Sequence, residues 1–393
     1  MIRRFHTLAL LLGFAGVSTA QAAYVPPSDD TVLAEVPSRL DPAARTLSRL
    51  RAQLSAQPQN LDAALAYAEA ALRMGRSRAD PRYFGYAEAA LAPWWSLATP
   101  PGTVLVLRAT IRQFFHQFDS ARSDLDQALA ANPRDAQARL TRAVVLMAQG
   151  RPQDAAQDCS ALRGLAPALD VAACSAASAS LSGKAPRALA LLDFATAGVG
   201  QAADSAALWA LTTAAEIAER LGDASTTARY DQALAAMDRS GQPDAYLLAA
   251  WADAALQRGD AAVVVARLQA YTDIDNLLLR LALAEQQLGR DGEALRRHCR
   301  MIEERFAAAQ ARGEFVHQRE AAMYQLQLAR NPPAALQLAR SNWAVQREPL
   351  DALILLQAAA AAAQPAAATP VREWLQQTGL QDVRITRALK ALP

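Results

Sequence analysis

From about residue 41 onward, apolar residues recur every three or four positions, in stretches of about 12 to 16 residues. This spacing places them on one face of an α-helix. Short turns separate the stretches, and a glycine closes six of them, which is typical of helices that end in the left-handed conformation. These glycines are Gly75, Gly150, Gly183, Gly222, Gly259 and Gly289. The pattern predicts an all-α protein built from helical hairpins.

The chain also repeats itself with a period of 34 residues between Leu105 and Pro167. Ala109, Ala121 and Pro133 recur as Ala143, Ala155 and Pro167. Arg108 and Asp124 recur as Arg142 and Asp158. An alanine lets two helix backbones approach closely, so we expect the four alanines where the helices of each hairpin meet.

The repeated residues resemble the tetratricopeptide repeat, a 34-residue helix–turn–helix unit with a small residue in each helix and a proline that closes the second. The resemblance implies a right-handed α-superhelix, or solenoid, of about nine hairpins. It further implies a scaffold whose concave groove, lined by first helices, binds protein or peptide segments. The first helices are expected near Leu61, Thr103, Asp135, Leu169, Asp204, Asp244, Asp275, Phe315 and Leu350. We expect the solenoid to span residues 41–379 and residues 380–393 to cap its open end.

Two charged pairs stand at matching positions of the two copies. In an antiparallel hairpin, Arg108 and Arg142 lie within about one turn of the height of Asp124 and Asp158, so a salt bridge across each hairpin is expected. Two roles remain open: the pairs orient the helices, or the arginines face the groove and bind a carboxylate of a peptide. The family's usual tryptophan and leucine positions are filled differently here, by Leu105 and Arg108 and then by Arg139 and Arg142.

Cys159 and Cys174 lie on consecutive predicted helices, eight residues before and seven after Pro167. Equal height on neighbouring helices permits a disulfide, and two buried free thiols are the alternative. Cys299 would remain unpaired in either case.

Eight of the 23 aromatic residues fall within 36 positions, which requires a reason. They are Tyr83, Phe84, Tyr86, Trp94, Trp95, Phe114, Phe115 and Phe118. Either they form a packed knot between the first two hairpins, or they offer a platform for a peptide or a glycan.

The N-terminus has the pattern of a secretory signal peptide. Arg3 and Arg4 precede an apolar run, Leu8 to Val17, that is too short to cross a membrane. Ala20 and Ala22 provide the small residues that signal peptidase requires, so residues 1–22 are predicted to be removed and residues 23–40 to form a flexible leader. We therefore expect an exported protein without a membrane span after cleavage. In a Gram-negative organism its location would be the periplasm.

Charge and composition argue against several other functions. The formal net charge is +2, from 40 Lys and Arg and 38 Asp and Glu, so no basic face for nucleic acid is expected. The four histidines do not have metal-ligand spacing with cysteines or carboxylates, and catalytic motifs are lacking. We therefore expect no cofactor and no enzymatic activity. The alternative is an envelope enzyme resembling lytic transglycosylases, in which an α-superhelix carries a separate catalytic domain.

Overall fold

The computed structural model describes residues 28, 42–197, 204–289, 292–312 and 318–392. The predicted signal peptide, and the predicted leader apart from Ser28, lie outside these residues. The chain divides into two compact units, residues 1–45 and 46–393, and the elements described below belong to the second apart from the start of α1 (Pro42–Ala56).

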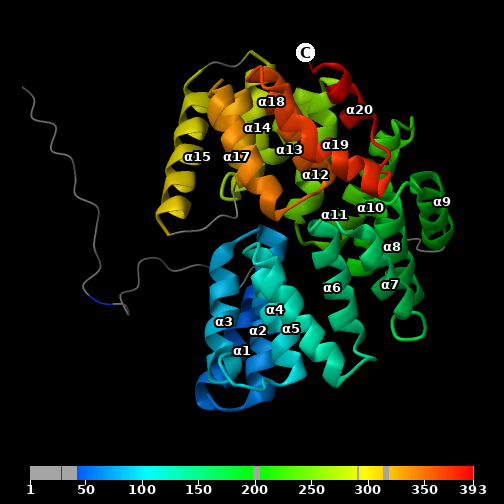
Figure 1. Ribbon diagram of the computed structural model, residues 1–393. Coiled ribbons are helices and arrows are strands. Elements are labelled where there is room, and N and C mark those ends of the chain that lie inside the picture. Colours follow the sequence, from blue (N-terminus) through cyan, green and yellow to red (C-terminus); the bar gives the residue numbers. More distant parts are fainter. Residues whose placement is uncertain (1–27, 29–41, 198–203, 290–291, 313–317, 393) are drawn as a thin grey trace, which may run out of the picture. The chain divides into compact units, whose positions relative to one another are not determined.

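Throughout the described residues the secondary structure is helical, and consecutive helices pair as hairpins (Figure 1). The pairs are α2 (Leu61–Arg78) with α3 (Pro81–Trp95), α4 (Gly102–Phe114) with α5 (Phe118–Ala131), α6 (Ala136–Ala148) with α7 (Pro152–Ala161), α8 (Ala168–Ser180) with α9 (Ala185–Thr196), α10 (Ser205–Leu221) with α11 (Thr226–Ser240), α12 (Ala245–Arg258) with α13 (Ala261–Leu268), α14 (Asp275–Gln287) with α15 (Glu293–Ala311), and α16 (Gln318–Gln327) with α17 (Pro332–Val345). The last group comprises α18 (Pro349–Ala361), a 3-10 helix (Pro365–Ala368), α19 (Thr369–Thr378) and α20 (Val383–Lys390). The prediction of an all-α hairpin fold is confirmed.

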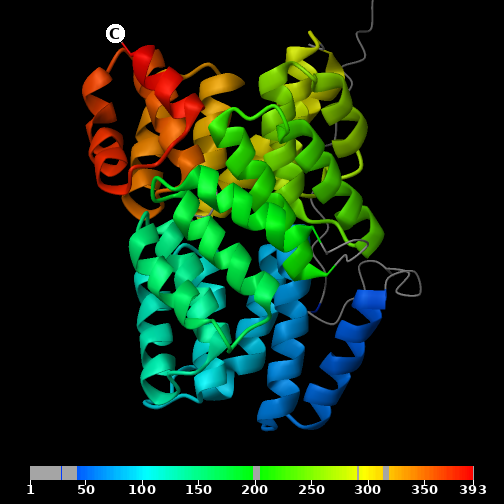
Figure 2. The ribbon, with the colours of Figure 1, turned by 90° about the vertical axis from the view of Figure 1, so that its right-hand side faces the viewer.

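The described hairpin starts agree closely with the sequence pattern. Eight of the nine first helices begin within one residue of the predicted position, and the ninth predicted start, Phe315, lies outside the described residues. Asp135, Asp204 and Asp244 cap α6, α10 and α12, because each carboxylate accepts a backbone N–H three residues later, at 2.8–2.9 Å. Neighbouring hairpins then stack, as the views in Figures 1 and 2 show: α10 contacts α8 and α9 on one side and α12 on the other.

Five of the six predicted turn glycines have the left-handed backbone that ends a helix, with φ between 68° and 89°. The prediction for Gly75 is wrong, because α2 continues to Arg78 and ends at Ala79, whose φ is 48°. Gly75 is buried inside the helix, where a Cβ atom would lie 2.6 Å from Cε2 of Phe84. The missing side chain therefore serves close packing against α3 and not a turn.

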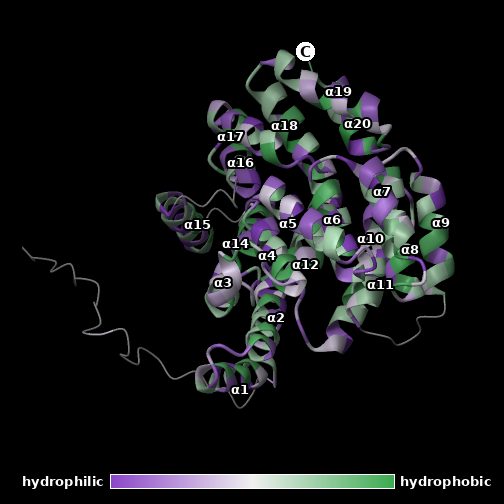
Figure 3. Cartoon of the chain, turned by 60° about the horizontal axis from the view of Figure 1, so that its bottom comes forward, coloured by the Kyte–Doolittle hydropathy of each residue, from purple (hydrophilic) through white to green (hydrophobic). Residues whose placement is uncertain are grey.

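The alanines of the 34-residue period lie in the hairpin interiors. Ala109, Ala121, Ala143 and Ala155 are all 0% exposed. The first two share one hydrophobic cluster, and the last two share another. Pro133 lies in the turn before α6, and Pro167 directly precedes α8. Hydrophobic and hydrophilic residues alternate along most helices (Figure 3). The hydrophobic residues that face neighbouring helices provide the burial that holds such a stack together.

The C-terminal segment touches the turns of three earlier hairpins. Trp374 donates from Nε1 to the carbonyl of Gly150 at 3.2 Å, and the Gly379 carbonyl lies 2.9 Å from where a Cβ of Gly183 would be. At Gly222 the nearest side chain is Val383. The sequence predicted only a polar cap for residues 380–393. In the structure α20 contacts both α18 and α10, so the last repeat is joined to repeats in the middle of the chain.

Candidate functional site

The first predicted charged pair is part of a cluster of three residues. Asp124 accepts from Nη2 of Arg108 at 2.7 Å and from Nη1 of Arg112 at 2.6 Å. The Asp124 side chain is 6% exposed, and Arg108 also donates to the carbonyl of Trp95 at the end of α3. Arg108 therefore connects its own hairpin, α4 and α5, to the preceding one.

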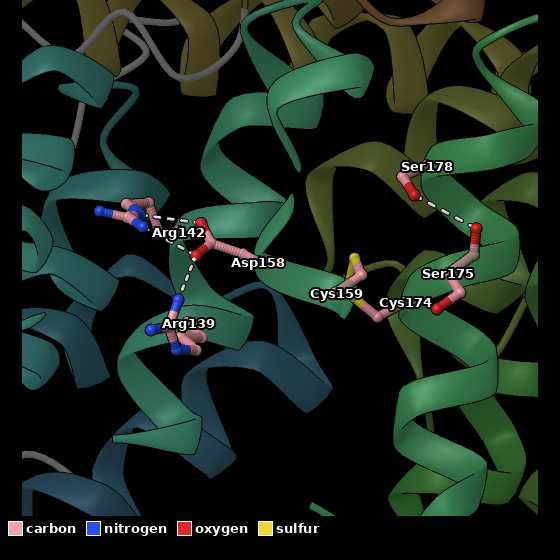
Figure 4. Close-up of a disulfide and its surroundings, with 7 residues drawn as sticks. All are labelled: Arg139, Arg142, Asp158, Cys159, Cys174, Ser175 and Ser178. Atoms are coloured by element: carbon pink, nitrogen blue, oxygen red, sulfur yellow. Dashed lines mark hydrogen bonds and ion pairs between the residues drawn. A yellow bond between two sulfur atoms is a disulfide. The ribbon is translucent and has the colours of Figure 1, made fainter. Parts of the chain in front are cut away.

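The second copy has the same construction (Figure 4). Asp158 on α7 accepts from Arg142 at 2.7 and 2.8 Å and from Arg139 at 3.1 Å, both on α6. Arg142 makes a further bond, at 2.7 Å, to the exposed Asp126 of the preceding hairpin. The hydrogen bond to Asp158 is the main reason why the pKa of Arg142 is raised.

These contacts favour the structural one of the two roles that the sequence left open. The arginines direct their guanidinium groups at buried aspartates, so those donors are not available to a ligand carboxylate. Sequence reasoning missed the second arginine of each cluster, Arg112 and Arg139. Their spacing was an available signal, since Arg112 lies four positions after Arg108 and Arg139 three positions before Arg142, on the same helix face.

A disulfide joins α7 to α8. The structure links Cys159 and Cys174, whose Cα atoms are 5.4 Å apart and whose side chains are buried (Figure 4). The sequence left this bridge and two free thiols as alternatives. Cys299 on α15 is the free cysteine among the described residues, and burial raises the pKa of its thiol.

Most of the aromatic residues near the N-terminus form a packed knot. Phe84 is 1% exposed and stacks on Phe114 with ring centroids 3.6 Å apart, and Phe115 meets both rings edge-on. Tyr86 differs, because it is 48% exposed and packs edge-on against Tyr83. The knot joins α3 to α4, and the two tyrosines remain at the surface.

Polar side chains from four first helices form a cluster that the sequence did not reveal. The hydroxyl of Tyr246 on α12 donates to Glu216 on α10 at 2.6 Å. Arg319 on α16 bonds to Asp351 on α18 at 2.6 Å and to Glu348, the residue that caps α18. We call these five residues the first-helix cluster. Glu348 lies near enough to Glu216 for like-charge repulsion to raise the pKa of the Glu216 carboxyl, so the two parts are neighbours.

The environment of this cluster is unusual. Burial raises the pKa of the Glu216 carboxyl, and burial together with the neighbouring Glu216 carboxylate raises the pKa of Tyr246 well above its ordinary value. Tyr246 is nevertheless 58% exposed. Water therefore reaches the ring while protein surrounds it closely enough to desolvate the hydroxyl. Among the described residues no cation forms an ion pair with Glu216, although the more distant Arg220 lowers its pKa in part.

A second polar group closes the contact between α20 and α10. Glu219 accepts from Arg384 at 2.5 Å and from the Tyr230 hydroxyl at 2.9 Å, and Arg384 also binds Asp382 at 2.7 Å. Burial raises the pKa of Glu219, and Arg384 lowers it only in part. The pairing spans 165 positions in sequence. No local pattern could have predicted it.

A metal-binding cluster and a membrane-spanning helix are both absent from the described ranges. No group of three or more His, Cys, Asp or Glu residues there could hold a metal ion. No helix in those ranges has both the length and the apolar character needed to cross a bilayer.

The paired alanines, the closing prolines and the hairpin geometry agree with comparisons to known proteins. A tetratricopeptide repeat model matches residues 107–170. This segment is similar to tetratricopeptide repeats. The match covers α5, α6 and α7 in full, and it contains every charged residue of both clusters. No curated protein matches the chain.

Solved structures with similar helical arrangements share little sequence. A chain of the APC/C hetero-tetramer Cut9–Hcn1 is 12% identical with a TM-score of 0.41, covering 80% of this chain and 52% of that one. A tetratricopeptide repeat protein from Parabacteroides merdae is 14% identical with a TM-score of 0.37, covering 66% and 92%. Yeast Tom70 is 10% identical with a TM-score of 0.39, covering 90% and 86%. The chain thus spans about half the length of the first of these.

Proposed function

We propose that this repeat protein is an exported scaffold that binds protein or peptide segments through its first helices, in cell-envelope assembly or secretion. The observation that carries the proposal is the first-helix cluster, in which Tyr246 is 58% exposed and bonded to Glu216 of the adjacent repeat. An aromatic ring beside a carboxylate without an ion-pair partner suits a basic side chain of a bound segment. Four repeats contribute to the cluster, which supports recognition of an extended segment.

The N-terminal pattern and the disulfide support the exported location. Arg3 and Arg4, the short apolar run and the small residues at Ala20 and Ala22 are the parts of a cleavable signal. A buried disulfide persists in an oxidising compartment and rarely in the cytosol. Mass spectrometry of the protein recovered by osmotic shock should show Ala23 as its first residue. An intact Met1 in that fraction would contradict export by this route.

The binding proposal is tested by affinity capture with the mature protein from an envelope fraction, followed by mass spectrometry. A specific partner should be lost or strongly depleted with Tyr246→Ala and with Glu216→Gln. Tyr86→Ala is the matched control, because Tyr86 is similarly exposed but lies on the second helix α3. Equal recovery of every partner by all four proteins would refute binding at the first-helix cluster.

A further inference from the structure

A polar pocket of about 300 Å³ lies between α7 and α8, away from the first-helix cluster. Its volume is at the lower end of the range of about 300–1,000 Å³ for small-molecule sites. The polar lining combines an amide, hydroxyl groups and two cations: Gln153, Ser160, Arg163, Ser175, Ser178, Ser182 and Lys184. The pocket therefore has the size and the polarity for a small, hydrophilic ligand.

The pocket wall carries positive charge without compensation. No carboxylate lines it, and among the described residues neither Arg163 nor Lys184 forms an ion pair. This differs from Arg108 and Arg142, whose guanidinium groups are bonded to buried aspartates. Arg163 donates only to Ser160, to its hydroxyl at 2.9 Å and its carbonyl at 3.3 Å. Both cations can therefore turn a donor toward an oxyanion.

The serine hydroxyls set a second requirement on the ligand. Ser178 donates its hydroxyl proton to the carbonyl of Ser175 at 3.2 Å, and Ser182 donates to the carbonyl of Ser178 at 2.8 Å. Ser178 is only 1% exposed, so the partly exposed Ser182 is the serine of this pair that a ligand can reach, and with its proton engaged its oxygen can only accept. A complementary ligand must therefore present a hydrogen-bond donor to Ser182 and negative charge to the cations.

The disulfide holds the two walls of this pocket together. Cys159 directly precedes Ser160 on α7, and Cys174 directly precedes Ser175 on α8 (Figure 4). The covalent link fixes the separation of the helices beside the pocket, so less ordering is needed when a ligand binds.

We propose that the pocket between α7 and α8 binds a small hydroxylated oxyanion, such as a sugar acid or a sugar phosphate. The oxyanion is held by Arg163 and Lys184, and a ligand hydroxyl donates to Ser182. This binding activity is separate from the proposed scaffold function, because its residues lie on α7, on α8 and in the segments that follow these helices.

Isothermal titration calorimetry of the purified full chain tests the proposal, with gluconate, glucose 6-phosphate, inorganic phosphate and glucose as probes. We expect gluconate or glucose 6-phosphate to bind at least about tenfold more tightly than glucose and inorganic phosphate, since each of the latter supplies half of the required chemistry. Lys184→Ala should weaken binding at least about tenfold, the usual scale for one lost charged hydrogen bond. Arg187→Ala is the matched control on α9, an exposed cation outside the pocket lining.

A second variant distinguishes binding in the pocket from a general effect of the protein's charge. Ala179→Leu adds bulk to the pocket wall without changing charge, and it should abolish binding while the far-UV circular dichroism stays that of the parent. The proposal is overturned if neither gluconate nor glucose 6-phosphate binds at millimolar concentration, or if inorganic phosphate binds as tightly as the sugar phosphate. It is equally overturned if Lys184→Ala and Arg187→Ala behave alike.

Discussion

Arg142 binds two aspartates that differ in burial, so substituting each aspartate in turn tests how much a buried ion pair stabilises the fold. Arg142 bonds to Asp158 and to Asp126, but the first side chain is 3% exposed and the second 55%. We predict that Asp158→Ala destabilises the protein far more than Asp126→Ala. The reason is that only the first substitution removes a buried carboxylate, which Arg139 and Arg142 share, and it leaves Arg139 without an ion-pair partner.

The expected magnitude follows from these contacts. Removing one partner of a buried ion pair costs about 3–5 kcal/mol, because the remaining charge keeps its desolvation penalty. The side chains of Arg139 and Arg142 are 20% and 24% exposed, so they can turn partly toward water, and we expect the lower end, about 3 kcal/mol. Loss of Asp126 removes an exposed, solvent-screened pair and should cost about 0–1 kcal/mol.

The assay is urea unfolding of the parent and both variants, followed by far-UV circular dichroism and by tryptophan fluorescence, with the free energy of unfolding from linear extrapolation. Coincident transitions from the two probes justify a single free energy for each protein. If the two variants lie within about 1 kcal/mol of each other, the stabilising role of Asp158 is refuted. The arginines would then have to be reconsidered as ligand-binding groups.

Gly75→Ala should destabilise the chain by about 1–3 kcal/mol in the same assay, because its Cβ would overlap a phenylalanine ring. Gly85→Ala, in a helix with open space around it, should instead stabilise by about 0.5–1 kcal/mol; equal effects would contradict the packing argument. Burial raises the pKa of Glu216 above 4.5, so stability conferred by its protonated form is lost as the pH rises through the folded-state pKa. Glutamine does not ionise, so Glu216→Gln does not lose this stability. The melting temperature of the variant minus that of the parent should therefore be larger at pH 7.5 than at pH 4, and an equal difference at both pH values would contradict the raised pKa. Non-reducing peptide mapping should recover Cys159 and Cys174 in one linked peptide, and replacing both by serine should cost about 3 kcal/mol for a loop of about 15 residues; three alkylatable thiols without reductant would exclude the bridge.

Sequence reasoning located the hairpins well, because it relied on local signals. Most hairpin starts have a side-chain cap or a proline within a few residues, as at Asp135 and Asp244, and a helical period marks the apolar face. The alanine positions were equally accessible, since a 34-residue period forces equivalent residues into equivalent packing. Gly75 shows the limit of this approach, because a glycine needed for close packing looks the same in sequence as one needed for a turn.

The polar sites were harder to foresee because their partners are distant in sequence. Tyr246 and Glu216 are 30 positions apart, and Arg384 and Glu219 are 165 apart. Each pairing depends on how several repeats stack, and small differences in helix length between repeats change which side chains meet. The pocket between α7 and α8 was hard to predict for a different reason. Its small side chains, such as Ala156 and Ala179, look like ordinary helix-packing residues until the stack shows that nothing fills the space beside them.

The use of charge connects these observations to function. The sequence contains 40 basic and 38 acidic residues, and this near balance predicts no strong overall field toward nucleic acid or an anionic membrane. The structure shows that much of this balance is internal, because arginines such as Arg108 and Arg319 pair with aspartates that are almost completely buried. Those pairs set the geometry of the stack and are closed to ligands. Glu216 on the first helices and Lys184 in the pocket wall are among the described residues that form no ion pair, and we propose them as binding groups, the former for a cationic segment and the latter for an oxyanion.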